Sequence, residues 1–238
     1  MLFDCGPSVT NNLHDIVKNF TEIEHVFISH SHFDHFLGLP YLMIGRHLDV
    51  IAKRKKDPDY ISSVLHVYLP KGLKEILINL INTCHSDIEK LSYPVIYHEI
   101  DTTEILIDNH IRIVPFEVNH TVICFGFLVY IDNHKILGYS SDTLFDDNII
   151  EKMANSEYLI AEGMVPDSEI AFSRKGKHAT FNDLLNVVNI IKPKTAFAVH
   201  LQPRYLDMQR NISEELNSAS KSTILFPEVR KTYVLRIY

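Results

Sequence analysis

The chain has 238 residues, of which 46% are hydrophobic, and its formal net charge is −7. This length is enough for a large α/β core, and the negative charge argues against a protein that mainly coats nucleic acid. No apolar run approaches the ~18–20 residues that span a bilayer, and the first residues lack the basic and apolar segments of a secretory signal. We therefore predict a single domain over residues 1–238, a cytoplasmic location and no membrane association.

The three cysteines, Cys5, Cys84 and Cys124, are an odd and widely spaced set. Such a set is not a disulfide framework. We predict that all three are reduced and buried as small hydrophobic residues.

The first predicted element is a short buried strand over residues 24–28, and a dense group of histidines follows it. Residues two apart point the same way from an extended chain, so His30 and His32 can bind one ion together. A turn directly after His32 would bring Asp34 and His35 to a second ion. Imidazole and carboxylate ligands suit zinc, iron or manganese. The alternative is a histidine-rich surface loop, because the chain has 14 histidines.

Between this segment and residue 100 the pattern predicts a turn, a charged loop and one helix. Gly38-Leu39-Pro40 is expected to close the histidine segment as a turn. The basic run at residues 53–56 lies beside two aspartates, which favours a solvated loop over a nucleic-acid contact. Apolar residues at helical spacing then predict an amphipathic helix, and they are Leu73, Ile76, Leu77, Leu80 and Ile81.

The middle of the chain is rich in predicted strands. These cover residues 111–114, 125–130 and 135–137. Asp132-Asn133-His134 is predicted as a hairpin turn, which accounts for His134 without a ligand role.

The last third alternates helices and strands. Thr180 and Asp183 form a predicted capping box for a helix that runs to about Ile191 and ends before Pro193. Residues 195–199 then form a buried strand that delivers His200 at its end. A polar helix over residues 203–220 and a strand over residues 232–238 complete the prediction.

Several motifs together resemble the metallo-β-lactamase superfamily of dinuclear metal hydrolases. The pattern His-x-His-x-Asp-His at residues 30–35 is similar to the metal motif of that superfamily, and further motifs follow in the same order. They are Leu2–Gly6, Asn119–Thr121, Gly138–Thr143 and Val199–Leu201. Gly176–Thr180 and Pro203–Tyr205 look like the phosphodiesterase branch, which contains ribonuclease Z and small cyclic-phosphate phosphodiesterases. The resemblance covers residues 2 to about 205.

The resemblance implies a fold and a metal site. The expected fold class is α/β, an αββα four-layer sandwich. His30, His32 and His120 would hold one divalent ion, Asp34, His35 and His200 would hold a second, and Asp142 would bridge both. Zinc is the expected metal, with manganese or iron as alternatives. Asp34 and His178 are the expected catalytic residues, and Ser141 and Thr143 are expected to orient Asp142.

The function implied is that of a metal-dependent hydrolase. We predict a phosphodiesterase in which a hydroxide bridging the metals attacks phosphorus, while His178 protonates the leaving oxygen. His178 could instead be an ordinary residue beside the Thr180 cap, and Arg204 could either hold the loop after His200 or contact substrate. A hydrolase of thioesters or lactones, or a non-catalytic metal-stabilised protein, are the alternatives from other classes.

Two departures from the family refine the substrate and the fold. Ribonuclease Z enzymes commonly carry an arm that grips tRNA between the equivalents of His120 and Asp142. Only 21 residues separate those two here, enough for two strands and a turn. This favours a small phosphodiester or a cyclic nucleotide as substrate over RNA, with tRNA 3′ processing as the alternative, and a homodimer is expected by resemblance. The family usually has further strands before the segment Leu2–Gly6, which we expect this chain to lack. A misassigned start codon is the explanation that we favour over replacement of those strands by a partner subunit or a less stable protein.

Overall fold

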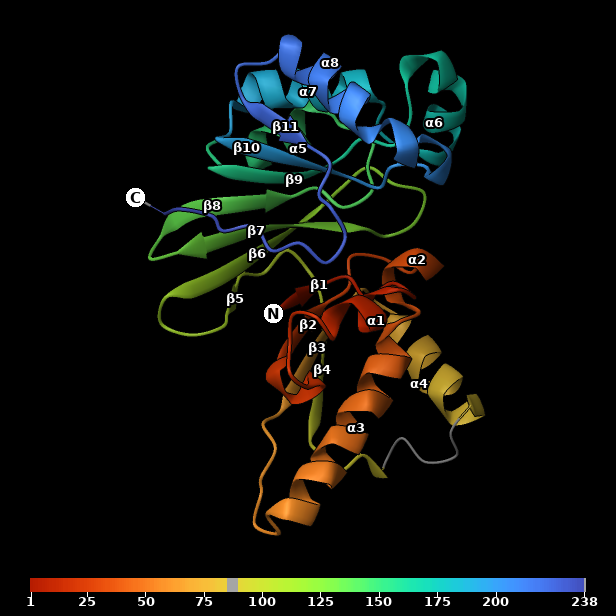
Figure 1. The fold of residues 1–238 in the computed structure, drawn as a ribbon, viewed down its shortest axis with the longest axis vertical. Coiled ribbons are helices and arrows are strands. Elements are labelled where there is room, and N and C mark those ends of the chain that lie inside the picture. Colours follow the sequence, from red (N-terminus) through yellow and green to blue (C-terminus); the bar gives the residue numbers. More distant parts are fainter. Residues whose placement is uncertain (85–89, 238) are drawn as a thin grey trace. The chain divides into compact units, whose positions relative to one another are not determined.

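The computed structural model describes residues 1–84 and 90–237. The chain forms two compact units, Met1–Ile100 and Asp101–Tyr238, and each has its own sheet and core (Figure 1). The single domain over residues 1–238 stays a prediction.

The N-terminal unit is built on a parallel four-stranded sheet in the order β1-β2-β3-β4. The strands are β1 (Leu2–Phe3), β2 (His25–Phe27), β3 (Leu65–Leu69) and β4 (Val95–Glu99). The helical segments are α1 (Val9–Leu13), η1 (Phe20–Glu22), α2 (Phe33–Phe36), α3 (Leu39–Lys56) and α4 (Leu73–Cys84).

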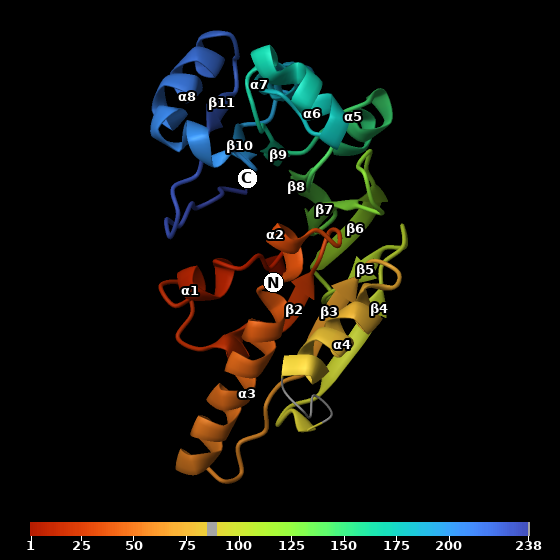
Figure 2. The same cartoon turned by 90° about the vertical axis from the view of Figure 1, so that its right-hand side faces the viewer.

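Alternation along the strands gives this sheet one aliphatic face and one aromatic face. Val26 and Val67 are fully buried in a core that also contains residues of α3 and α4. The other face carries parallel stacked rings, with Phe27 and Tyr68 only 4.2 Å apart between ring centroids. The helices α3 and α4 therefore cover one face of this sheet (Figure 2).

The C-terminal unit contains a mixed seven-stranded sheet in the order β11-β10-β9-β8-β7-β6-β5. Strands β5 to β8 pair antiparallel, and β8 to β11 pair parallel. The strands are β5 (Ile105–Leu106), β6 (Ile111–Glu117), β7 (Phe125–Ile131), β8 (His134–Tyr139), β9 (Tyr158–Glu162), β10 (Thr195–Val199) and β11 (Thr223–Leu225).

Helices cover one face of the parallel half of this sheet (Figure 1). They are α5 (Asp147–Met153), α7 (Phe181–Ile191) and α8 (Gln209–Ser218), and the unit also contains η3 (Asp167–Glu169), α6 (Ile170–Gly176) and η4 (Pro203–Met208). Leu184, Val187 and Val188 of α7 are buried against the sheet. The parallel order matters for function, because the carboxyl ends of β8, β9 and β10 gather at one edge.

Most predicted elements are confirmed. The strands over residues 111–114, 125–130, 135–137 and 195–199, the helix from Leu73 and the capping box of α7 are all present. Asp132 and Asn133 both have positive φ, as expected for the predicted turn. The 21 residues after His120 form the hairpin of β7 and β8, as expected.

Three predictions differ from the structure. Gly38-Leu39-Pro40 is a turn only in part: Gly38 lies in a turn, but α3 begins at Leu39, because proline is tolerated in the first helical turn. The basic run at residues 53–56 is the last turn of that helix rather than a loop, and cations are favourable at a helix C-terminus. Residues 232–237 form no strand, and Tyr238 lies outside the described residues.

The cysteine prediction is confirmed in part. All three cysteines are free, and Cys5 and Cys124 are buried, but Cys84 is exposed at the end of α4.

Candidate metal centre

In the N-terminal unit the histidine segment leaves β2 and turns directly into α2, which begins at Phe33. This is the turn that the sequence predicts after His32. His30 is fully buried and His35 nearly so, whereas the Asp34 side chain is 61% exposed. The rings of His30 and His35 lie 4.1 Å apart between centroids, and those of His30 and His32 lie 4.7 Å apart. The four predicted ligands of this unit therefore form one local cluster.

Asp4, just after β1, orients this cluster. Its carboxylate accepts hydrogen bonds from the Ser29 backbone N–H (2.7 Å), the Ser29 hydroxyl (2.9 Å) and Nδ1 of His35 (2.8 Å). A carboxylate only accepts, so Nδ1 of His35 carries the proton and Nε2 presents a lone pair. The Ser29 hydroxyl has donated to Asp4, so it accepts from Nδ1 of His30 at 2.9 Å, which fixes the same tautomer there.

Close backbone contacts hold the segment in place. The Cys5 N–H donates to the His35 carbonyl at 2.6 Å, and the Gly38 N–H donates to the Cys5 carbonyl at 2.7 Å. A Cβ on Gly6 would collide with the Asp34 backbone, and a Cβ on Gly38 would collide with the Gly6 backbone. Glycine is therefore required at both positions.

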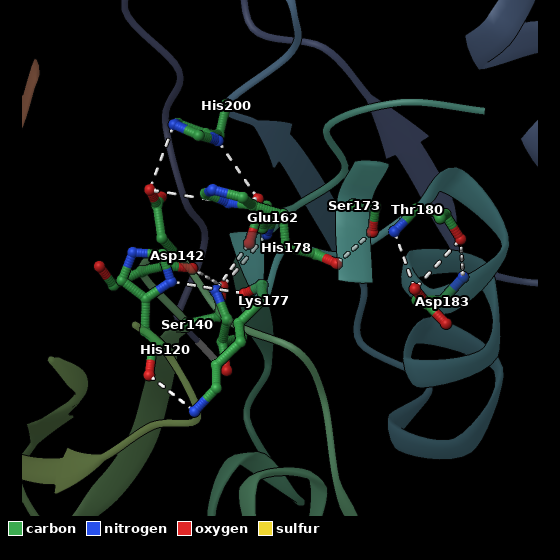
Figure 3. A network of polar contacts seen from close by, with 12 residues as sticks. His120, Ser140, Asp142, Glu162, Ser173, Lys177, His178, Thr180, Asp183 and His200 are labelled. Carbon is green, nitrogen blue, oxygen red and sulfur yellow. Dashed lines mark hydrogen bonds and ion pairs between the residues drawn. The ribbon is translucent and has the colours of Figure 1, made fainter. Parts of the chain in front are cut away.

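In the C-terminal unit the polar residues follow the ends of neighbouring strands (Figure 3). Asp142 follows β8, Glu162 is the last residue of β9, and His200 follows β10. His120 lies in the loop between β6 and β7, and His178 lies between α6 and α7. Five segments that are far apart in sequence thus contribute to one cluster.

Glu162 is the centre of this cluster and is fully buried. Its Oε1 accepts from Nδ1 of His178 at 2.7 Å and from Nδ1 of His200 at 3.2 Å, and its Oε2 accepts from the Thr143 N–H at 2.6 Å (Figure 3). Both imidazoles are therefore held by Nδ1, which leaves their Nε2 atoms directed away from Glu162.

The contact between His200 and Asp142 tests whether a cation fits here. Nε2 of His200 lies 3.2 Å from Oδ2 of Asp142, which is 2% exposed. With Nδ1 of His200 donating to Glu162, a neutral ring would present a lone pair to a carboxylate, and the two would repel. A proton or a metal ion between the two atoms removes this repulsion, so the donor set fits a divalent metal.

His120 is held by a reciprocal contact with Lys177. Nδ1 of His120 lies 3.4 Å from the Lys177 carbonyl oxygen, and Nζ of Lys177 donates to the His120 carbonyl at 3.0 Å (Figure 3). Lys177 has a φ of 55°, and Ser141 and His200 also have positive φ. Such strained backbone conformations concentrate at functional sites.

The model of the Anti-Pycsar protein Apyc1 family matches residues 1–221. The chain belongs to this family. Curated relatives with matching sequence include ribonuclease Z of Bacteroides fragilis strain YCH46, 24% identical over 284 residues that cover 95% of this chain and 87% of the relative. Ribonuclease BN of Citrobacter koseri is 27% identical over 196 residues, which cover 82% of this chain and 55% of the relative.

Solved structures share the fold of this family member. Human tRNase Z, short form, superposes with a TM-score of 0.76 and is 19% identical in sequence. The superposition covers 99% of this chain and 88% of the human chain. The metallo-β-lactamase fold protein YhfI from Bacillus subtilis superposes with a TM-score of 0.74 and is 17% identical in sequence. This superposition covers 96% of this chain and 84% of the YhfI chain. The predicted metallo-β-lactamase fold and ribonuclease Z-like branch are thus confirmed.

The structure also adds residues that the sequence did not single out. Asp4 lies in a segment with recognised resemblance, but no pattern distinguishes its carboxylate, and Glu162 is a single acid at a strand end. The sequence left open whether Arg204 holds the loop after His200 or contacts substrate, and the contacts of Arg204 favour the first role. It pairs with Glu169, which also accepts from the Tyr205 hydroxyl, so it holds the loop after His200 against the start of α6.

No helix among the described residues is both long and apolar enough to cross a membrane. The seven predicted ligands and the two predicted catalytic residues stay predictions, and their assembly into one centre belongs to the proposal that follows.

Proposed function

We propose that this metal-dependent hydrolase is a phosphodiesterase with two divalent ions, most simply Zn²⁺, that acts on a small or cyclic phosphodiester such as a cyclic nucleotide. The single observation that carries the proposal is the carboxylate–imidazole arrangement around Glu162. There, one fully buried carboxylate fixes His200, a metal ligand by resemblance, and His178, a histidine beyond the ligand set.

The proposed ligands divide between the two units. His30, His32 and His120 would hold one ion, Asp34, His35 and His200 the other, and Asp142 both. When bound, two divalent ions supply Lewis acidity that lowers the pKa of water and offsets charge on phosphate oxygens. The tautomers fixed by Asp4, Ser29 and Glu162 present Nε2 lone pairs to such ions.

His178 would supply the proton that the leaving oxygen needs. Its Nδ1 donates to Glu162 at 2.7 Å, and this hydrogen bond orients the ring. Nε2 of the protonated ring can then donate to the oxygen that departs from phosphorus. Glu162 acts through His178 and His200, so it is a positioning residue rather than a catalytic one.

The shape of the β7–β8 hairpin favours a small substrate. Between His120 and Asp142 the chain forms β7, a two-residue turn, β8 and a short connecting segment at each end. Residues 121–141 are all described and contain no inserted arm. The arm with which ribonuclease Z enzymes commonly bind the body of a tRNA is therefore missing from this segment. A family named for an Anti-Pycsar protein rather than for ribonuclease Z is consistent with a different substrate.

The second candidate is a tRNA 3′ processing endonuclease. Curated relatives over most of the chain are named ribonuclease Z, which favours this function. The two candidates share the proposed site and differ only in substrate size.

The first experiment is hydrolysis of bis(p-nitrophenyl) phosphate by metal-loaded and chelator-stripped protein. We expect metal-dependent turnover that Asp142→Ala abolishes and that Asp147→Ala, an exposed aspartate five residues on, leaves intact. Metal analysis should give two ions per chain, and loss of one ion from His35→Ala would support the division of ligands.

A second comparison then separates the substrates. Cyclic nucleotides, a precursor tRNA and a thioester are offered to the same preparation. Faster turnover of cyclic nucleotides supports the proposal, and faster cleavage of precursor tRNA supports the second candidate. A folded protein that binds two metals but cleaves only the thioester would overturn both.

A further inference from the structure

The turn between α6 and α7 carries a lysine in a strained conformation. Helix α6 ends at Gly176, and Lys177 follows with a φ of 55°. Glycine is the usual residue at this place, because a side chain with a Cβ is strained in the left-handed region. Such strain persists where the surrounding structure enforces it. The contacts of Lys177 therefore indicate why a lysine occupies this position.

The turn also fixes the backbone of His178. A Cβ on Gly176 would lie 2.6 Å from Cδ2 of the His178 ring, so the smallest residue is required there. The His178 N–H donates to the Ser173 carbonyl at 3.0 Å, and the Ser173 hydroxyl donates to the His178 carbonyl. The glycine thus stands where the His178 ring needs space, and the strained position beside it keeps a long cationic side chain.

Lys177 joins this turn to the loop that carries His120. Nζ of Lys177 donates to the His120 carbonyl at 3.0 Å, and the Lys177 carbonyl accepts from Nδ1 of His120 at 3.4 Å (Figure 3). A carbonyl oxygen only accepts, so Nδ1 of His120 carries the proton and its Nε2 presents a lone pair. The rings of His120 and His178 meet edge to face, with 5.0 Å between their centroids.

We propose that Lys177 is a positioning residue whose reciprocal contact with His120 holds that ligand at a fixed separation from His178. The inference rests on the proposed function, in which His120 binds one ion and His178 supplies a proton. Glu162 links His178 to His200, a ligand of the other ion, and Lys177 links the turn before His178 to His120. The proton donor is thereby placed relative to both ions.

The Nζ contact is the stronger part of this link. A hydrogen bond from an ammonium group is charge-assisted and roughly twice as strong as a neutral one. It acts on the backbone of His120, so it fixes the loop and leaves Nε2 of the ring to a metal ion. Without Nζ, the loop would keep the longer 3.4 Å contact and lose the charge-assisted one.

Lys192 is the matched control for Lys177. It lies at the C-cap of α7 with a φ of 56°, its N–H donates to the Val188 carbonyl, and it is exposed. The two positions therefore have the same residue in the same backbone conformation at the end of a helix. Of the two, Lys177 is the one bonded to a proposed ligand.

Titration of metal-free protein with Zn²⁺ in competition with a chelating dye tests the proposal without turnover. Lys177→Met keeps the backbone strain and removes the donor, and it should lower the affinity for one of the two ions about tenfold. In a His120→Ala background the same substitution should leave the affinity for the remaining ion unchanged. Lys177→Arg keeps a donor and should recover most of the affinity, and Lys192→Met should change neither ion.

Hydrolysis of bis(p-nitrophenyl) phosphate at saturating Zn²⁺ tests the link to His178. Lys177→Met should lower kcat about tenfold and leave KM unchanged, because Lys177 acts through His178 and not through the substrate. Lys177→Gly removes the same donor and relieves the strain, so it gives the same comparison if Lys177→Met folds poorly by circular dichroism.

Three results would overturn the proposal. The first is a Lys177→Met variant with the Zn²⁺ affinity and kcat of the original chain, and the second is an equal loss of affinity for both ions. The third is a raised KM with unchanged kcat, which would make Lys177 a direct contact of the substrate phosphate. An original chain that binds two Zn²⁺ ions without turnover would refute the proposed function instead, and the Zn²⁺ titration would still decide whether Lys177 positions His120.

Discussion

The two units hold their halves of the proposed centre in different ways. In the N-terminal unit four predicted ligands come from six consecutive residues, and hydrogen bonds from the short segment Asp4 to Gly6 hold them in place. In the C-terminal unit the polar residues come from five separate segments, and a single buried Glu162 links three of those segments. The ligands of the first half are thus neighbours in the sequence, whereas those of the second half come together only when the sheet has formed.

The two units also differ in the charged side chains that they bury. Arg46 is fully buried in the N-terminal unit, where its guanidinium donates to the carbonyl oxygens of Phe20, Ile23 and Ser63 and lies 4.9 Å from the ring of Tyr93. Burial lowers the pKa of Arg46. The C-terminal unit instead buries the carboxylates of Asp142 and Glu162. The N-terminal unit thus buries a guanidinium that holds loops together beside the Asp4 carboxylate that orients its histidines, whereas the polar cluster of the C-terminal unit is organised around buried carboxylates.

Removal of Arg46 should have the largest effect on stability. Arg46→Ala leaves three carbonyl groups without their donor, and we expect the free energy of unfolding to fall by about 3–5 kcal/mol. Urea unfolding of metal-free protein measures this. Arg174→Ala is the control in the other unit, where the pair with Asp183 is 35% and 21% exposed and should contribute about 1 kcal/mol or less. Equal losses in the two variants would contradict the contrast between the units.

The two orienting carboxylates should separate metal binding from proton transfer. Asp4→Asn and Glu162→Gln should each lower metal affinity or kcat/KM by about 10- to 100-fold. Asp4 contacts the predicted ligand His35, so Asp4→Asn should weaken metal binding. Saturating metal should compensate for the weaker binding and return kcat to a near-normal value. Glu162→Gln should lower kcat even at saturating metal and shift its pH profile, because it also releases His178.

Metal titration and kinetics at saturating metal distinguish these outcomes. Glu157→Gln, at the start of β9, is the control, since Glu157 pairs with the exposed Lys194. If saturating metal restored the kcat of both carboxylate variants equally, His178 would have no role in proton transfer.

The same contrast explains what sequence could predict. The histidine segment, the β6–β8 strands, the capping box of α7 and His200 at the end of β10 each follow from a local pattern of polarity or charge. Asp4 and Glu162 do not follow from such a pattern, because each is a single acidic residue whose role depends on distant partners. Asp4 contacts Ser29, 25 positions away, and Glu162 contacts His200, 38 positions away. Helix α3 was missed because Gly38 and Pro40 resemble a turn, although tertiary packing of Leu42 and Met43 overrides that local signal.

The cap of α7 offers a smaller effect. The Thr180 hydroxyl accepts from the Asp183 N–H and the Asp183 carboxylate accepts from the Thr180 N–H, which completes a capping box. Thr180→Ala should therefore lower the free energy of unfolding by about 1 kcal/mol. Ser8, the N-cap of α1, makes no side-chain cap bond, so Ser8→Ala should leave stability within about 0.5 kcal/mol of the original. Thermal unfolding of the two variants measures the difference, and equal effects would mean that the cap of α7 adds no stability.

Acid should affect the N-terminal unit at a higher pH than the C-terminal unit. Burial, and then the neighbouring His66, lower the pKa of His25 and of His98 below the ordinary 6.5. The unfolded chain binds protons at these two histidines more readily than the folded chain does, so stability is full above about pH 6.5 and falls as the pH drops below it. Burial raises the pKa of Asp183, but hydrogen bonds from Arg174 and Thr180 outweigh it and lower the pKa below 3.8. The stability that Asp183 contributes is therefore lost only below about pH 4.

Thermal unfolding between about pH 7 and pH 5 tests this order. The double variant His25→Gln/His98→Gln should lose less stability over this interval than the original chain, because it no longer gains protons on unfolding at these positions. Asp183→Asn should not change the response between these pH values, although it lowers stability at both. An original chain and a double variant with the same pH response would show that the stacked histidines of the aromatic face titrate alike in the folded and unfolded states. The contrast between the units would then rest on Arg46 and the buried carboxylates alone.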